Sequence, residues 1–319
     1  MMSVYVGIDV SKQTLDVATY PIAQSLHVSN TATGHQQLHK WLQQHDEVVQ
    51  IALEATGRYG EAVRDFLVAE GYAVSYLNPR QIHAFAQIEL HHHKTDRQDA
   101  QLIARYCALF EPDLYRPRPT LRKRLQQRSR RLDQLKKMRQ QEINRLQSGL
   151  QDTFVREQIE TVIAYFDSLI QQTQQAIHTM IASDDALTAQ QRLLCSIPGI
   201  GKTTADLILA EIDIDNFDDA RQLAAYIGIT PQHFESGTSV KKRAAISKQG
   251  NARLRCGLYM PAIVAKRYNP ACQRLAARLT DKRKHGKVIV IAVMRKLVHQ
   301  VYGILNSGRP FDPNFEQIA

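Results

Sequence analysis

The chain has 319 residues, 44% of them hydrophobic, and carries a formal net charge of +10. Such a chain can hold two or three globular domains, and its positive charge favours nucleic acid over a membrane surface as the partner. No apolar run reaches the roughly 18–20 residues of a membrane span, and the N-terminus shows no signal-peptide pattern, so we expect a cytoplasmic protein.

The first 110 residues alternate short apolar runs with helical patterns. The runs predicted as strands are 4–10, 14–20, 24–28, 48–53 and 73–77. The predicted helices are 34–45 and 59–70, the second closed by Gly71 as its C-cap. Three strands, a helix, a strand, a helix and a strand form the order of an RNase H-like domain, so the sequence predicts an α/β domain of that class.

Four carboxylates stand at the ends of these predicted elements. Asp9 lies at the end of the first strand, Glu54 ends the fourth, and Asp96 and Asp99 open a helical segment. Asp9 and Glu54 should lie on neighbouring strands, and acids three residues apart share a helix face. Oxygen ligands suit Mg²⁺, and two such ions about 3.5–4 Å apart can catalyse phosphoryl transfer. The sequence therefore predicts a metal site. The simpler alternatives are that Asp9 caps a strand end and that Asp99 caps a helix or pairs with Arg97.

Neither the cysteines nor the histidines have the spacing of a zinc site. The four cysteines are far apart and form no Cys-x-x-Cys pair, so we expect buried free thiols. The run His91-His92-His93 lacks the i, i+4 spacing of a helical zinc pair. We interpret it, with Lys94 and Arg97, as a basic loop that faces phosphate.

A long basic coiled coil is predicted next. Between residues 116 and 145 there are twelve Lys or Arg and only two acidic residues. Leucines and a methionine recur there at spacings of three, four and seven, close to a heptad stripe, and a second apolar-striped helix spans 154–181. Two such helices indicate an antiparallel hairpin or a dimerising coiled coil. We expect nucleic-acid contacts at Arg122, Lys123 and Arg124, the alternative being a solvated basic face.

A glycine-containing turn opens the last region. Pro198-Gly199-Ile200-Gly201-Lys202-Thr203 lies between two apolar helical patterns. It is not a P-loop, because Ser196 stands where the first glycine of that motif should be. We interpret it as the hairpin of a helix-hairpin-helix, in which Gly199, Gly201 and Lys202 approach a phosphate at a helix N-terminus. The alternative is an ordinary packing turn between two helices.

A basic loop follows, and helices complete the chain. Residues 236–280 contain ten Lys or Arg and no acidic residue. Ser, Gly and Thr beside this charge predict a flexible loop that holds phosphate, with contacts at Lys241, Lys242, Arg243 and Lys248. Composition alone does not make a serine of this loop a nucleophile. The final predicted helices are 252–268, 270–279 and 287–305.

Five motifs occur in order along the chain. They are Gly7-Ile8-Asp9-Val10-Ser11-Lys12, Glu54-Ala55-Thr56-Gly57, Lys94-Thr95-Asp96-Arg97-Gln98-Asp99-Ala100, Pro198-Gly199-Ile200-Gly201, and Ser236-Gly237 with Ile246-Ser247-Lys248-Gln249-Gly250-Asn251. On these motifs the chain resembles the DEDD transposases of the insertion-sequence 110 family, the bridge-RNA-guided recombinases. The resemblance covers essentially the whole chain. It implies a RuvC-like catalytic domain at 1–110, a coiled coil at 111–185 and a helical transposase domain at 186–319.

The resemblance also implies a chemistry. It assigns Mg²⁺ to Asp9, Glu54, Asp96 and Asp99, and it makes Ser236 the nucleophile that forms a covalent phosphoserine with DNA. It further implies a structured guide RNA, the bridge RNA, that pairs with target and donor double-stranded DNA. The protein is then expected to act as a homo-oligomer, a dimer or a dimer of dimers, without a membrane partner.

Ser236 is chosen as the nucleophile because it directly precedes a glycine. Relatives often carry two serines followed by two glycines, where this chain reads Glu235-Ser236-Gly237-Thr238. Ser239 and Ser247 are neighbouring candidates. Two other functions stay open: a RuvC-like structure-selective nuclease that uses water as its nucleophile, and a non-catalytic nucleic-acid-binding protein. The base that activates the serine stays open, as does the sharing of one active site between protomers.

Overall fold

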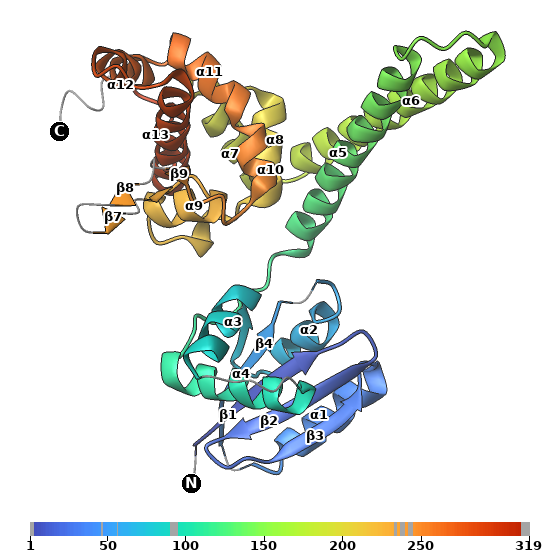
Figure 1. Cartoon of the computed structure of the whole chain (residues 1–319), viewed down its shortest axis with the longest axis vertical. Coiled ribbons are helices and arrows are strands. Elements are labelled where there is room, and N and C mark those ends of the chain that lie inside the picture. The colour runs from blue at the N-terminus through green and yellow to red at the C-terminus, as the bar shows by residue number, and fades with distance from the viewer. Residues whose placement is uncertain are drawn as a thin grey trace. The chain divides into compact units, whose positions relative to one another are not determined.

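The structure, a computed structural model, describes residues 3–45, 47–55, 57–89, 95–232, 235–236, 240–241 and 245–313, with the backbone alone at 235–236 and 240–241. The chain divides into two compact units, Met1–Pro117 and Arg118–Ala319 (Figure 1). This division lies close to the boundary predicted at residue 110. The boundary predicted at residue 185 falls inside the second unit, because helices on both sides of it share one hydrophobic core.

Unit 1 is built on a five-stranded sheet in the order β3-β2-β1-β4-β5. Its strands are β1 (Ser3–Val10), β2 (Thr14–Tyr20), β3 (Ser25–Ser29), β4 (Glu47–Glu54) and β5 (Val74–Leu77). β2 pairs antiparallel with both β1 and β3, whereas β4 pairs parallel with both β1 and β5. The predicted α/β region is confirmed, with small shifts at the strand ends. Its assignment to the RNase H class stays a prediction.

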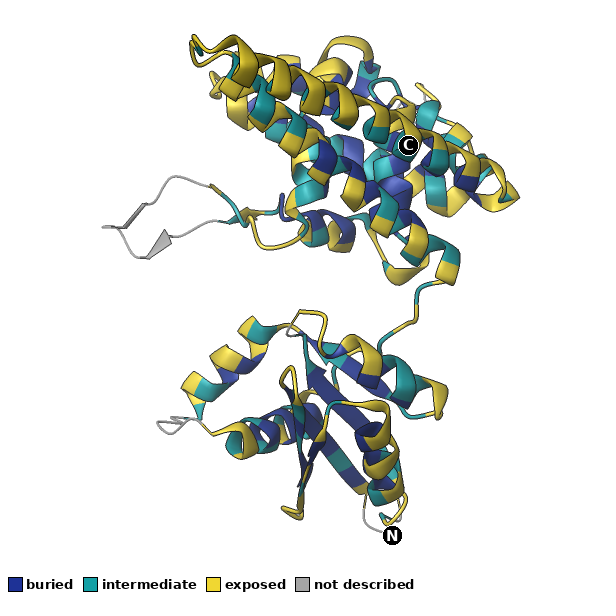
Figure 2. Ribbon diagram, turned by 90° about the vertical axis from the view of Figure 1, so that its right-hand side faces the viewer, coloured by how far each residue is buried: buried dark blue, intermediate teal, exposed yellow. Residues whose placement is uncertain are grey.

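Helices cover both faces of this sheet (Figure 2). Those that the structure describes in unit 1 are α1 (Ala32–Leu42), α2 (Glu61–Ala69), α3 (Pro79–Ile88) and α4 (Asp96–Phe110). Because side chains alternate along a strand, Val6 and Ile8 of β1 pack with α1 and α2 on one face. Gly7 lies on the opposite face, under α4, and Asp9 shares that face because it is two residues further on.

The helix α4 lies so close to β1 that only glycine fits at position 7. A Cβ atom at Gly7 would lie 2.2 Å from the carbonyl oxygen of Ala100 and 2.3 Å from the amide nitrogen of Ala104, both on α4. Protein interiors are close-packed, so a side chain here would have to push the helix away from the sheet. This close approach accounts for the glycine that interrupts an otherwise apolar strand.

The helix α3 is missing from the sequence prediction, which places no helix directly after the strand at 73–77, where Asn78 and Pro79 follow. The Asn78 side chain accepts a hydrogen bond from the amide of Arg80 at 3.0 Å, and the Gln81 side chain accepts one from the amide of Asn78 at 3.2 Å. Pro79 occupies the first helical position, where its missing N–H costs nothing. The dipeptide that ends the strand therefore also begins a helix.

The segment after α4 runs along the outer edge of β5. The amide of Tyr115 donates to the carbonyl of Val74 at 2.6 Å, and the hydroxyl of Ser75 donates to the carbonyl of Pro112 at 2.9 Å. The guanidinium of the buried Arg64, on α2, lies 4.1 Å from the ring centre of Tyr115. Backbone and cation–π contacts thus fasten this segment to the sheet.

Unit 2 begins with two long helices, α5 (Thr120–Leu146) and α6 (Thr153–Ala182). They run antiparallel, since Arg139 pairs with Asp167 at 2.6 Å and Arg128 donates to the carbonyl of Ala176 at 2.8 Å. Their apolar stripe is buried where they meet the rest of unit 2 and exposed further out. The buried members are Leu125, Leu132, Leu135, Ile177, Met180 and Ile181, and the exposed ones include Met138, Phe154, Val162 and Tyr165. The paired helices match the predicted hairpin, while the coiled coil itself stays a prediction.

Helices dominate the remainder of unit 2, which confirms the predicted helical C-terminal region. They are α7 (Asp185–Cys195), α8 (Lys202–Glu211), the 3₁₀ turn η1 (Ile214–Asn216), α9 (Ala220–Ile227), α10 (Ala252–Gly257), α11 (Tyr259–Tyr268), α12 (Pro270–Asp281) and α13 (Gly286–Ser307). Two short antiparallel strand pairs interrupt them between α9 and α10. These join β6 (Pro231–Gln232) to β9 (Ala245–Ile246), and β7 (Glu235–Ser236) to β8 (Val240–Lys241).

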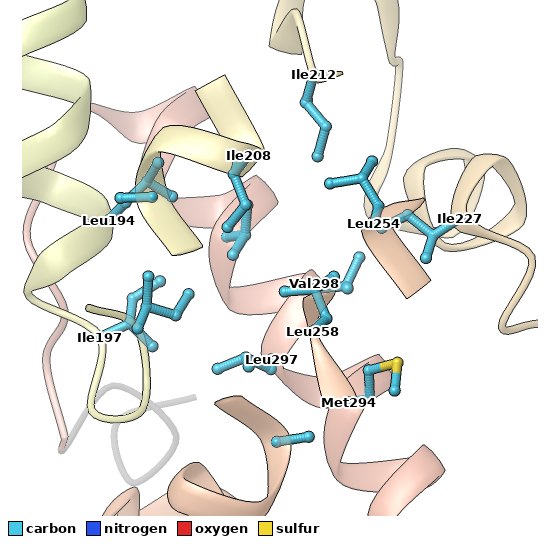
Figure 3. Packing of buried hydrophobic residues seen from close by; sticks show 14 of the residues in the cluster. Leu194, Ile197, Ile208, Ile212, Ile227, Leu254, Leu258, Met294, Leu297 and Val298 are labelled. Carbon is cyan, nitrogen blue, oxygen red and sulfur yellow. The ribbon is translucent and has the colours of Figure 1, made fainter. Parts of the chain in front are cut away.

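The helix α13 forms the centre of the unit 2 core (Figure 3). By length and composition it could pass for a membrane span, with a mean hydropathy of 1.6 over its most apolar window. Its side chains Met294, Leu297 and Val298 are at most 1% exposed and pack in one cluster with residues of α8, α9 and α10. A core helix satisfies the same length and hydropathy test, and α13 is one.

All four cysteines are free, as the sequence predicts. Cys107 and Cys272 are buried, which raises the pKa of their thiols to about 12 and about 11 respectively. The expectation of burial is wrong for Cys256, which is exposed on α10. Because Leu254 of that helix faces the core, a residue two positions further on points the opposite way.

Candidate active site

The strand register brings Asp9 and Glu54 together. In the parallel pair of β1 and β4, Ile8 lies beside Leu53, and the next residue of each strand is a carboxylate. Ala52 packs into the core on the α4 side of the sheet, so Glu54, two residues later, faces the same side as Asp9. The prediction that these acids lie on neighbouring strands is therefore correct.

The first turn of α4 supplies the other two acids. Thr95 is the N-cap of this helix, its hydroxyl accepting a hydrogen bond from the amide of Gln98 at 3.3 Å. Asp96 is the first helical residue and Asp99 stands one turn further on. The alternative that Asp99 caps the helix is therefore wrong, because Thr95 holds that position. Asp96 is exposed and Asp99 half-buried.

The four predicted acids form one electrostatic cluster around Asp9. Burial, followed by the charges of Asp99, Asp96, Glu54 and Asp16, raises the pKa of the Asp9 carboxyl to about 6. Like charges held together in this way disfavour ionisation unless a cation balances them. The structure thus brings together side chains that are far apart in the sequence.

An oxygen-only donor set of this kind fits Mg²⁺. Within the described ranges, no three His, Cys, Asp or Glu side chains already stand in a metal-binding arrangement. Mg²⁺ is commonly held by one or two carboxylates, with waters and substrate phosphate oxygens as the remaining ligands. The pair Asp9 and Glu54, beside the acidic first turn of α4, meets that requirement without a closed protein cage.

Asp16 is a member of this cluster that the sequence analysis missed. It lies directly opposite Asp9 in the antiparallel pair of β1 and β2. Opposite residues of such a pair share a face, so Asp16 points to the same side of the sheet. Its carboxylate is 2.9 Å from Nδ1 of His27, the residue opposite it on β3. Glu54, Asp9, Asp16 and His27 thus form a polar row across four strands. The sequence did carry a signal for Asp16, because an acidic residue interrupts the largely apolar strand predicted at 14–20.

The basic loop predicted before α4 lies mostly outside the described residues. This applies to His91, His92, His93 and Lys94. Arg97 is described, and its side chain is exposed on the first turn of α4. It follows Asp96 in the sequence, and its contact with phosphate stays a prediction.

Ser236 lies on β7, opposite Val240 of β8. Its side chain falls outside the described residues, as does that of Lys241 on β8, and so do Lys242, Arg243 and the alternative serine Ser239 in full. The structure therefore places the backbone of the predicted nucleophile in a short hairpin. Lys248 is exposed near the end of the loop that contains it.

Arg122 is a structural residue of unit 2. Its guanidinium donates to the carbonyl oxygens of Leu209 and Ile212 at 3.3 and 3.0 Å, and to the side chain of Gln190 at 2.9 Å. The guanidinium is thus engaged at the C-terminal end of α8, and the nucleic-acid contact predicted at Arg122 stays a prediction. On the same helix Arg124 is exposed and Lys123 is half-buried.

The predicted hairpin glycines have different surroundings. Gly199 has φ 110°, and a Cβ atom there would lie 2.9 Å from both the amide nitrogen of Ala265 and the carbonyl oxygen of Pro261 on α11. Close packing against α11 therefore requires glycine at this position, and its predicted phosphate contact stays a prediction. Gly201 and Lys202 are exposed at the start of α8, and a Cβ atom at Gly201 would meet nothing within 4 Å. The helix-hairpin-helix stays a prediction, supported by this open helix start.

Two family models match the chain. One, described as a transposase, covers residues 6–155, and the other, described as Transposase IS116/IS110/IS902 family, covers residues 191–277. The chain is 35% identical to the pilin gene-inverting protein of Moraxella lacunata, over 99% of this chain and 100% of that protein. The Moraxella bovis protein of the same name is 34% identical with the same coverage. A transposase for insertion sequence element IS1111A of Coxiella burnetii is 26% identical over 64% of this chain and 62% of that protein.

Proposed function

This chain belongs to the IS110 family of transposases, and from that premise we propose that it recombines DNA through a covalent phosphoserine on Ser236, with Mg²⁺ held by its carboxylates and a guide RNA selecting the sites. The single observation that carries the catalytic half of the proposal is the cluster of Asp99, Asp96 and Glu54 around Asp9.

The carboxylates would hold the metal at the carboxyl ends of β1 and β4. Asp9 and Glu54 are side by side there, and Asp96 and Asp99 add negative charge from α4. When bound, Mg²⁺ would neutralise charge on the scissile phosphate and favour attack on phosphorus. The exposed Arg97 would bind a non-bridging phosphate oxygen and so orient the DNA strand.

Ser236 would supply the attacking oxygen. Its Oγ forms a bond to phosphorus, the bond from phosphorus to one strand oxygen breaks, and the hydroxyl proton leaves to a base while the strand oxygen gains a proton. The phosphodiester energy is kept in the serine–phosphate bond. A hydroxyl of another DNA end can then attack the same phosphorus, release Ser236 and seal the new strand without ATP.

Exposed positive charge on unit 2 would hold the nucleic acids. Arg124, Arg131 and Lys137 are exposed on α5, and Lys202 is exposed at the start of α8. Such groups bind phosphates regardless of sequence, so they suit a protein that leaves base recognition to RNA pairing. The proposed partners are accordingly a structured guide RNA together with target and donor duplex DNA, bound by a homo-oligomer.

DNA inversion is a second candidate outcome of the same chemistry. It is favoured by the whole-length match to proteins named for pilin gene inversion. Strand exchange between two sites on one DNA inverts the segment between them when the sites face each other. Exchange between sites on separate molecules inserts one DNA into the other. The chemical step is common to both outcomes.

The deciding experiment is a denaturing gel that detects a covalent protein–DNA adduct. Wild-type protein with guide RNA, Mg²⁺ and labelled site DNA should give the adduct, and Ser236→Ala should give neither adduct nor cleavage. Ser239→Ala and Ser247→Ala serve as matched controls and should retain the adduct. Cleavage by Ser236→Ala without an adduct would indicate a water-dependent nuclease, and absence of all cleavage in wild type a non-catalytic binder.

The product of the reaction needs a separate substrate. A plasmid with two recognised sites in opposite orientation should yield the inverted segment if the protein is an invertase. A pair of plasmids with one site each should yield a cointegrate if insertion is its main reaction. Sequencing of the junctions distinguishes the two.

A further inference from the structure

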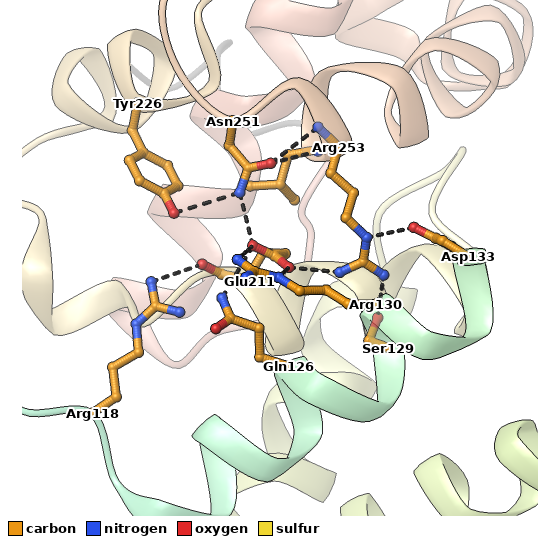
Figure 4. Close-up of polar contacts among 10 residues, drawn as sticks. Arg118, Gln126, Ser129, Arg130, Asp133, Glu211, Tyr226, Asn251 and Arg253 are labelled. Atoms are coloured by element: carbon orange, nitrogen blue, oxygen red, sulfur yellow. Dashed lines mark hydrogen bonds and ion pairs between the residues drawn. The ribbon is translucent and has the colours of Figure 1, made fainter. Parts of the chain in front are cut away.

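A buried carboxylate joins three parts of unit 2. Glu211, the last residue of α8, is only 1% exposed. Four side chains donate to it: Arg253 at 2.6 Å, Asn251 at 2.8 Å, and Arg130 and Gln126 at 3.2 Å each (Figure 4). Burial by itself raises the pKa of Glu211, but hydrogen bonds from Arg130, Asn251 and Arg253 outweigh it and lower the pKa. The group is therefore ionised and fully paired.

Asn251 stands where the serine loop, residues 229–250, returns to the helical core. It is the N-cap of α10, its side-chain oxygen accepting from the amides of Arg253 and Leu254 at 3.1 Å each. Its own amide donates to the carbonyl of Tyr226, in the last turn of α9, at 2.7 Å. One residue thus binds the entry of the loop, its exit and Glu211.

Glycine at position 250 permits the exit of the serine loop to pass close to the end of α9. Gly250 has φ 138°, and a Cβ atom there would lie 2.2 Å from the carbonyl oxygen of Tyr226. The amide of Lys248 donates to the carbonyl of Gly228 at 3.1 Å, and that of Ser247 to Thr230 at 2.9 Å. The two ends of the serine loop are therefore held against each other by backbone bonds.

The other side of the cluster is the basic helix α5. Arg253 donates to Asp133 and, at 2.7 Å, to the hydroxyl of Ser129, both on α5. Arg130 reaches Glu211 from the same helix while its side chain stays 56% exposed. Glu211 thus connects the base of the serine loop to the helix that presents positive charge to solvent.

This connection exceeds what helix packing requires. The helices involved already share the hydrophobic core of unit 2. A buried carboxylate needs one cation to balance its charge, whereas Glu211 binds two arginines and two amides from two elements. The donors lie either on α5 or at the exit of the serine loop. Hydrogen bonds placed in this way hold the exit of the loop at a fixed position relative to α5.

We propose that Glu211 is a positioning residue that, through Asn251, fixes the base of the serine loop relative to α5 and so sets where Ser236 meets DNA held by that helix. This inference rests on the proposed role of Ser236. It assigns to Glu211 and Asn251 an effect on the reaction without contact to the reacting atoms. Misplacing a reacting group by about 1 Å can cost about 100-fold in rate.

Asn251→Ser gives the sharpest test. Serine can still cap α10 but is too short to reach Glu211, whereas Asn251→Ala removes both functions. Glu211→Gln removes the charge that pairs with Arg253 and Arg130. The matched control is Asp167→Asn, which breaks the exposed ion pair with Arg139 on the outer part of the helix pair.

Hydrogen exchange measures how firmly Glu211 and Asn251 hold the base of the serine loop. In Asn251→Ser and Glu211→Gln, the backbone amides of Ser247, of Lys248 and of the residue at position 251 should exchange at least about tenfold faster, because each variant removes a charged hydrogen bond. Amides of α13 should keep wild-type rates. Unchanged exchange at the loop ends in both variants would overturn the inference regardless of any activity.

The rate at saturating DNA reports the positioning role. Asn251→Ser should form the Ser236 adduct about 100-fold more slowly, with nucleic-acid affinity and Tm close to wild type. Asp167→Asn should keep the wild-type rate. A wild-type adduct rate in Asn251→Ser, despite faster exchange, would refute the positioning role. If wild-type protein cleaves without any adduct, the serine mechanism fails, and the cleavage rate of the same variants then decides the role of Glu211.

Discussion

Asp9 and Asp16 lie directly opposite each other on the adjacent strands β1 and β2. Like charges at such positions destabilise a sheet unless other groups offset the repulsion. The carboxylate of Asp16 is close to Nδ1 of His27, and that of Asp9 faces the acidic turn of α4. The two aspartates lie at the centre of the polar row that runs across four strands of unit 1.

Removing acids one at a time should lower the pKa of Asp9 by unequal amounts. The expected order of effect is Asp99→Asn, Asp96→Asn, Glu54→Gln and then Asp16→Asn, which follows the strength of their charges on Asp9. NMR titration of the Asp9 carboxyl in each variant, with a chelator present, would measure this pKa. Glu61→Gln, on α2, is the control and should leave the value near 6. A larger effect of Asp16→Asn than of Asp99→Asn would contradict the arrangement.

Stability should fall as pH rises through the titration of Asp9. Its pKa is about 6 in the folded chain against an ordinary value of 3.8, so ionisation is less favourable after folding. Below about pH 3 the Asp9 carboxyl is protonated in both the folded and the unfolded state, and the penalty vanishes. Asp9→Asn should therefore raise Tm at pH 7 and leave it unchanged at about pH 3. Two pKa units at 1.36 kcal/mol each set an upper limit of about 3 kcal/mol. Equal effects at both pH values would refute the explanation.

Mg²⁺ should offset the cost of ionising Asp9 in the folded protein and so raise its stability. At a hundredfold excess over its dissociation constant, a ligand specific for the folded state adds about 2.7 kcal/mol of stability. Thermal unfolding at pH 7 with and without Mg²⁺ should show this gain in wild type and a smaller one in Asp9→Asn and Glu54→Gln. Asp65→Asn, which alters an acid paired with Arg64 elsewhere in unit 1, is the control. An identical gain in all variants would place the metal elsewhere.

Gly7→Ala should destabilise unit 1 and disturb the acidic cluster together. The new Cβ atom would meet backbone atoms of α4, and overpacking of this kind costs about 1–3 kcal/mol. As α4 moves outward, Asp96 and Asp99 retreat and the pKa of Asp9 should fall. Gly60→Ala is the control, since its Cβ atom would meet only the Tyr76 side chain, at 3.2 Å. A lower Tm with an unchanged Asp9 pKa would show that the acids do not depend on this contact.

Charge on α5 should control the salt dependence of nucleic-acid binding. Neutralising Arg124, Arg131 and Lys137 to Gln should flatten the log–log salt slope by about 0.9 for each duplex phosphate that the protein no longer neutralises. The sequence recombined should not change. Arg122→Gln is the internal contrast, because it breaks hydrogen bonds to α8 and should lower Tm while leaving the slope intact. An unaltered slope in the triple variant would mean that these side chains are a solvated face.

Local patterns predicted most strands and helices of unit 1, because alternation and capping are properties of neighbouring residues. The acids Asp9 and Glu54 were found for the same reason, as each ends an apolar run. Asp16 was not found, since its place beside Asp9 depends on register between strands. In the sequence Arg122 cannot be told apart from the basic residues beside it, because its contact with the end of α8 depends on tertiary packing. Gly199 and Gly201 look alike in the sequence, and only the contact with α11 separates them.

The fastening of residues 112–115 to β5 protects the sheet from self-association. An edge strand offers free N–H and C=O groups to any other strand, including that of a second copy, and so invites aggregation. Here the amide of Tyr115 occupies the carbonyl of Val74, and the Arg64 guanidinium holds the Tyr115 ring in place. The segment that connects the two units thus also shields one border of the sheet. A fragment ending at Phe110 would lack that shield and should form oligomers through β5, whereas one ending at Pro117 should stay monomeric in sedimentation.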